Sequence, residues 1–101
     1  MAYYLVKAKL LASKRSDLAK RLESGEVRQM KPFGKALDYS LKNARNNGDD
    51  FWIWEEEDYC SPPLAMERAA LLDAYFVNLD VEKVEKDKGW QHIEQLARVW
   101  T

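Results

Sequence analysis

The 101-residue sequence has little of several things that usually point to a function. One cysteine cannot form an internal disulfide, and one cysteine with one histidine cannot complete a closed zinc site without carboxylates. The four glycines stand apart from one another, so there is no GxGxxG or Walker A loop to cradle phosphates. We therefore expect no metal and no cofactor.

Long apolar runs are also missing. No stretch approaches the length of a transmembrane helix, and the N-terminus lacks the pattern of a signal peptide. With the single cysteine, this predicts a cytoplasmic protein that has no contact with a membrane. The basic residues form no tight cluster and no aromatic–basic RNA motif, so nucleic acid is an unlikely partner.

What is present favours one small globular domain over residues 1–101. Apolar residues make up 47% of the chain and charged residues 33%. Residues 1–48 carry a net charge of +7 and residues 49–101 a net charge of −8. Because distant segments mix in a small domain, we expect these two halves to interleave and neutralise each other.

The most informative stretch is the centre of the chain, residues 51–63, which holds two of the four tryptophans and the cysteine. Residues 51–54 are aromatic or β-branched and predict a buried strand that is apolar on both faces. Acidic residues follow from Glu55, so the strand leaves the core there. Ser61 and Pro62 suit the N-cap and first position of a helix, which places Cys60 at a strand–helix junction.

Periodicity predicts the remaining elements. We expect strands at residues 3–11, 26–31, 51–58 and 76–84, the second of them weak. Helices are expected from Ser13 or Ser16 to Glu23, over residues 35–46 and 62–74, and over the last amphipathic segment near residues 90–100.

This order predicts an α+β fold, a ferredoxin-like βαββαβ sheet with an inserted helix and a C-terminal helix. The first and third strands are expected to be central and parallel, and the first strand to pair with the last, antiparallel. Lys7 and Lys9 would then share a sheet face with Asp80 and Glu82. Because the central strands are apolar on both faces, we expect a homodimer, paired as a dimeric α+β barrel.

A candidate site follows from these faces. Tyr3, Leu5, Trp52 and Trp54 would form an apolar wall, which polar side chains would face. Glu56 is the expected catalytic or orienting carboxylate, Lys7 its partner and Cys60 a possible nucleophile at the strand exit. The expected ligand-binding residues are Tyr3, Lys9, Trp52, Trp54 and Asp58. In the alternative, Phe51 and Ile53 occupy that face, which would bring Glu55 and Glu57 to it and put both tryptophans under the helices.

Two classes of function remain open. One is a protein that binds a small molecule in a pocket at the sheet or dimer interface, with or without catalysis. The other is a dimeric binding or assembly module with no chemistry. No catalytic motif decides between an enzyme and a binding protein.

Overall fold

The fold is an α+β arrangement built on an antiparallel sheet. The computed structural model describes residues 2–46, 48, 50–58 and 60–100. Within them, five strands follow the order β4-β1-β3-β2-β5. The long strands are β1 (Ala2–Leu10), β3 (Phe51–Asp58) and β4 (Phe76–Val84), and the two-residue strands are β2 (Arg45–Asn46) and β5 (Ala97–Arg98). The predicted α+β class is confirmed.

β1 lies between β3 and β4 and is antiparallel to both. The predicted pairing of the first and last strands is therefore confirmed, with Lys7 directly opposite Asp80. Lys9 and Glu82 lie on the same face as this pair, as predicted, because side chains alternate along each strand. The prediction that the first and third strands run parallel is wrong.

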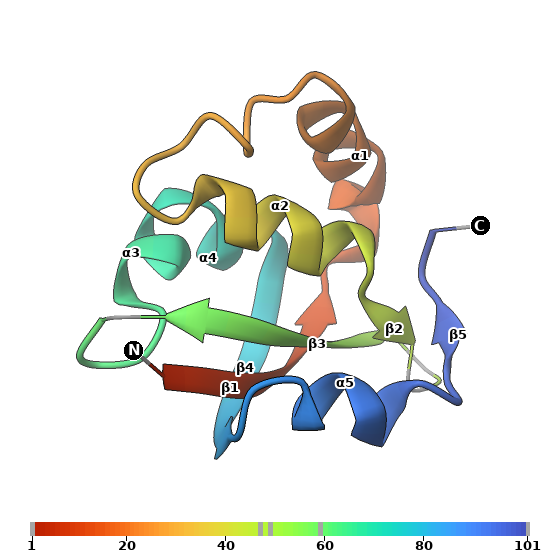
Figure 1. The fold of residues 1–101 in the computed structure, drawn as a ribbon. Coiled ribbons are helices and arrows are strands. Elements are labelled where there is room, and N and C mark those ends of the chain that lie inside the picture. Colours follow the sequence, from red (N-terminus) through yellow and green to blue (C-terminus); the bar gives the residue numbers. More distant parts are fainter. Residues whose placement is uncertain (1, 47, 49, 59, 101) are drawn as a thin grey trace.

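The sheet has an inner face and an outer face. We call the side that carries Val6, Ala8, Trp52 and Trp54 the inner face, and the side that carries Leu5, Lys7, Ile53 and Glu55 the outer face. Figure 1 shows the helices α1 to α4 on one side of the sheet and α5 on the other. Both tryptophans of the inner face are buried beneath these helices. Ile53 on the outer face is also buried, and α5 packs against β3 on that face.

The helices are short. A 3₁₀ turn (Ala12–Lys14) leads into α1 (Arg15–Glu23), and α2 (Gly34–Lys42) crosses the sheet next to β3. A second helical segment consists of α3 (Ala65–Glu67), a π-helical turn (Arg68–Leu72) and α4 (Asp73–Tyr75), and α5 covers Lys88–Ile93. Apolar residues four apart, Leu18 with Leu22 and Leu37 with Leu41, give α1 and α2 their buried sides.

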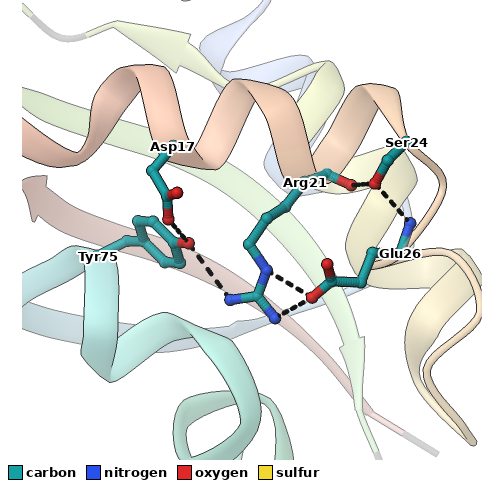
Figure 2. Close-up of polar contacts among 5 residues, drawn as sticks. All are labelled: Asp17, Arg21, Ser24, Glu26 and Tyr75. Atoms are coloured by element: carbon teal, nitrogen blue, oxygen red, sulfur yellow. Dashed lines mark hydrogen bonds and ion pairs between the residues drawn. The ribbon is translucent and has the colours of Figure 1, made fainter.

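A polar network fastens α1 to α4. Figure 2 shows the hydroxyl of Tyr75 donating to Asp17 and accepting from Arg21, which in turn is paired with Glu26. Burial is the largest effect that raises the pKa of Tyr75, and the hydrogen bond to Asp17 adds to it. The phenol therefore stays neutral and can donate and accept at once.

Several predicted boundaries are wrong for identifiable reasons. Residues 26–31 form turns rather than a strand, because this segment folds back on the start of α2. A Cβ on Gly34 would lie 2.6 Å from the carbonyl oxygens of Val27 and Arg28. The helix predicted for residues 35–46 ends at Lys42, and β2 follows.

Two later boundaries also differ. The helix predicted from Pro62 begins at Ala65, after a left-handed Leu64 (φ 63°) whose N–H donates to Asp58 instead of to Ser61. The last amphipathic segment is helical only over α5 and ends in β5.

Candidate functional site

A cavity of about 530 Å³ opens where β3 ends. Within the described residues, β2 pairs with β3 only at Trp52 and Ile53, so it leaves the rest of that edge of β3 without a neighbouring strand. α2 and α5 flank this edge from the two sides of the sheet, and α3 lies beyond the end of the strand (Figure 1). We call the resulting space the strand-exit cavity.

Aromatic side chains form one wall of the strand-exit cavity. Phe33 precedes α2, Tyr39 comes from α2 and Trp90 from α5. The rings of Tyr39 and Trp90 meet edge to face, with their centroids 6.1 Å apart. Tyr39 is 61% exposed, so the mouth of the cavity presents an aromatic ring to solvent.

Glu55 on β3 holds α5 in place against this wall. Its Oε1 accepts hydrogen bonds from the backbone N–H of Gly89 (2.8 Å) and Trp90 (3.3 Å), and its Oε2 from that of Asp87 (3.0 Å). Residue 89 must be small, since a Cβ there would lie 2.8 Å from Oε1. A strand carboxylate thus caps the start of α5 and fixes Trp90 beside the cavity.

Three acidic side chains gather on the inner side of the strand end: Glu56, Asp58 and Glu67, which we call the carboxylate cluster. All three are buried. Glu56 accepts a hydrogen bond from the indole Nε1 of Trp54 (3.1 Å), and Asp58 accepts one from the N–H of Leu64 (2.6 Å). Asp58 and Glu67 line the strand-exit cavity, whereas Glu56 lies behind them.

Burial and neighbouring negative charge raise the pKa values of Glu56 and Glu67. Burial raises the pKa of Glu56 well above its usual range, and the neighbouring charges of Glu67 and Asp58 raise it further. Burial, together with a hydrogen bond to Asp58, raises the pKa of Glu67 to about 7. Carboxyl groups with raised pKa values in a cavity are typical of functional sites.

Cys60 completes this group. Its Sγ lies 4.0 Å from Oε1 of Glu67, and one ligand atom from each of Asp58, Cys60 and Glu67 can be chosen so that all lie within 4.8 Å of one another. The N–H of Met66 lowers the pKa of the thiol, but burial and the charges of Asp58 and Glu67 raise it above its usual value. α3 begins five residues after Cys60 and not directly behind it as predicted, yet the N–H of Met66 in its first turn still reaches the thiol.

The predicted apolar wall does not form, because the predicted faces of β3 are reversed. On the outer face, β1 and β3 pair Tyr3 with Glu57, Leu5 with Glu55, Lys7 with Ile53 and Lys9 with Phe51. Trp52, Trp54 and Glu56 lie on the inner face, under the helices. Glu56 and Lys7 are therefore on opposite sides of the sheet and cannot act as partners. The alternative is confirmed: Phe51 and Ile53 share the face of Lys7, and both tryptophans lie under the helices.

Three of the predicted site residues do line the strand-exit cavity, namely Tyr3, Asp58 and Cys60. Lys7 instead lines a shallower groove of about 440 Å³ between α5 and β4, with Asp80 and His92. Lys9 is exposed on the outer face.

Sequence reasoning missed Glu67 and the aromatic wall. Leu64, Glu67 and Leu71 fall at spacings of three and four, so the acid lies on the buried side of its helix. An acidic residue between apolar residues on the same side of a helix is the sequence pattern that could have indicated Glu67. Phe33, Tyr39 and Trp90 come from three separate segments, and nothing in their spacing brings them together.

No family model, curated protein or solved structure matches this chain. Among the described residues, no helix has the length and apolar character needed to cross a membrane. Function is therefore argued from the geometry of the site.

Proposed function

We propose that this protein binds a small organic molecule in the strand-exit cavity. The observation that carries the proposal is the cavity itself. Its volume of about 530 Å³ lies within the range of roughly 300–1,000 Å³ that is usual for small-molecule sites. It joins an aromatic wall to a few converging polar groups, which is the composition expected of a ligand pocket.

The lining favours a ligand with an apolar body and a cationic or hydrogen-bond-donating group, because five acidic side chains and two lysines line the cavity. Phe33 and Trp90 offer flat surfaces for the apolar part. Lys35 and Lys86 are exposed at the cavity and place positive charge at its rim. Hydrogen-bond donors on the ligand can reach the carboxylates of Asp58 and Glu67.

A thermal-shift screen of metabolites, repeated on two variants, tests the proposal. A bound compound raises the melting temperature because it stabilises only the folded state. Tyr39→Ala removes an exposed ring from the cavity mouth and should abolish or reduce the shift with little loss of stability. Val77→Ala is the matched control, since Val77 is an exposed apolar residue of β4 outside the cavity lining. An equal shift in the wild type and Tyr39→Ala would place the ligand elsewhere and contradict the proposal.

The finer description of the fold is also a proposal. The order β4-β1-β3-β2 is that of a ferredoxin-like sheet, with the two-residue β2 as the second strand and β5 extending the edge, but the antiparallel pairing of β1 with β3 departs from that fold, in which these two strands are parallel. The free thiol of Cys60 supports a cytoplasmic location.

The alternative function is a dimeric binding or assembly module, with the homodimer formed through the outer face. Val77 supports it, because this apolar side chain is 41% exposed and lies opposite Lys9 on that face. α5 already buries Ile53, so an apolar outer face no longer requires a second copy. Sedimentation equilibrium at micromolar concentration decides the matter, and a monomer would refute the homodimer and the dimeric barrel.

A further inference from the structure

Among the described residues, no ion pair gives the carboxylate cluster a counter-charge. Glu56, Asp58 and Glu67 are 0%, 3% and 1% exposed. Across the described ranges, the ion pairs join Arg21 to Glu26, Lys42 to Asp38 and Arg68 to Asp73, and none reaches the cluster. Burying charge without a counter-charge is costly, so such a group either holds protons or binds a cation.

One atom of the cluster is left without any partner. Oε2 of Glu56 is fully buried and accepts no hydrogen bond from the part of the chain that the structure describes. Glu56 lies two residues before Asp58 on the same strand, so both side chains leave the inner face together. The charges of Glu67 and Asp58 act on Glu56, so its carboxylate lies within electrostatic range of theirs. A buried oxygen without a hydrogen-bond partner is rare and points to a ligand that satisfies it.

The spacing of the donors suits a small ion. The ligand atoms of Asp58, Cys60 and Glu67 lie within 4.8 Å of one another, and the sulfur-to-oxygen distance to Glu67 is 4.0 Å. Ligands of a tetrahedral zinc ion lie about 3.3–3.8 Å apart, given metal–ligand bonds of about 2.0–2.3 Å. An adjustment of up to about 1.5 Å brings these three donors onto one ion and leaves its fourth position open.

The surroundings already hold these donors in position. The N–H of Leu64 fixes one oxygen of Asp58 and leaves the other for a ligand bond. The indole of Trp54 holds Oε1 of Glu56 and leaves Oε2 directed away from it. Hydrogen bonds of this kind orient the ligands in metal sites.

From this geometry we propose that Asp58, Cys60 and Glu67 bind one divalent transition-metal ion of the zinc class, with the buried carboxylate of Glu56 as its support. The thiolate distinguishes this ion from Mg²⁺ and Ca²⁺, which prefer all-oxygen sites. Binding releases the protons of the thiol and of the carboxyl groups. The site does not depend on an organic ligand in the strand-exit cavity, although Asp58, Cys60 and Glu67 also line that space.

Titration with Co²⁺ and Zn²⁺ after dialysis of the full chain against EDTA tests the proposal. Co²⁺ should bind with one-to-one stoichiometry and show a thiolate-to-cobalt absorption band, and Zn²⁺ should displace it. Cys60→Ser should lose the band. Glu56→Gln should weaken the affinity for Zn²⁺ about 10–100-fold, as loss of a ligand or its support usually does. Glu94→Gln, at an exposed position on the same chain, is the matched control and should bind like the wild type.

Two outcomes would overturn the proposal. One is the absence of saturable Zn²⁺ and Co²⁺ binding at free concentrations up to about 100 μM. The other is binding that is unchanged in both Cys60→Ser and Glu67→Gln, because the ion would then lie on the surface. Glu67→Gln keeps the test valid if another variant fails to fold, since it removes a buried charge and keeps the side-chain volume.

Discussion

Replacing Glu55 with glutamine should destabilise the protein strongly, although the substitution hardly changes the size of the side chain. The carboxylate of Glu55 is buried and accepts three backbone hydrogen bonds from the start of α5. Glutamine keeps one oxygen, which can still accept from Gly89 and Trp90. Its amide group would face the N–H of Asp87, so that donor loses its acceptor and meets another donor.

The size of the effect follows from these three bonds. Hydrogen bonds to a charged group contribute about 1.5–3 kcal/mol each, and those between neutral groups about 0.5–1.5 kcal/mol. Glu55→Gln weakens two bonds by about 1–1.5 kcal/mol each and breaks one worth about 1.5–3 kcal/mol, so we expect a loss of about 3.5–6 kcal/mol in the free energy of unfolding. For a domain of this size, a loss of about 3.5 kcal/mol corresponds to a fall in Tm of roughly 14–28 °C.

Urea denaturation followed by circular dichroism measures this change directly. Glu94→Gln makes the same chemical change at an exposed position and should stay within about 0.5 kcal/mol of the wild type. If Glu55→Gln also stays within that margin, Glu55 does not hold α5 and the account of the aromatic wall fails. If it destabilises as expected, ligand binding should weaken as well, because Trp90 is no longer fixed beside the cavity.

Three further changes test other parts of the structure. Gly89→Ala places a Cβ 2.8 Å from Oε1 of Glu55 and should cost about 1–3 kcal/mol of stability by urea denaturation; a neutral result would contradict the close packing. Tyr75→Phe removes the hydroxyl that joins α1 to α4 and should lower the free energy of unfolding by about 1–2 kcal/mol, and no change would mean that this network is dispensable. The folded-state pKa of Glu67, about 7, lies above its unfolded value of about 4.3, so in EDTA the contribution of Glu67 to stability should be fully present below about pH 4 and should fall as the pH rises through 7. Glu67→Gln should remove about 2–3 kcal/mol of this fall in a pH series of unfolding curves, whereas an unchanged slope would assign it to other groups.

The sequence predicted the long strands well because their signal is local. β1, β3 and β4 are rich in β-branched and aromatic residues, and their limits were found to within about one residue. Alternation also showed that Trp52 and Glu55 lie on opposite faces of β3. It could not show which face meets the helices, because both faces are apolar and the partners of Glu55 are more than thirty residues away.

The unpredicted parts depend on contacts between distant segments. Val27 and Met30 gave residues 26–31 the composition of a strand, but the close approach of Gly34 turns this segment into a loop. The predicted site lies at the end of β3 where the strand-exit cavity opens, and Asp58 and Cys60 line that cavity. Its other wall comes from α2 and α5, and only the folded chain brings them to the strand end.

The place of β1 at the centre of the sheet has a consequence for the order in which the chain can fold. β1 leaves the ribosome before both of its neighbours, β3 and β4, which come from residues 51–84. Such non-local pairing is slow, because long loops must close before the strands can pair. Residues 2–10 therefore stay without these partners until residues 51–84 have been made, and the two lysines of this strand oppose its aggregation during that interval.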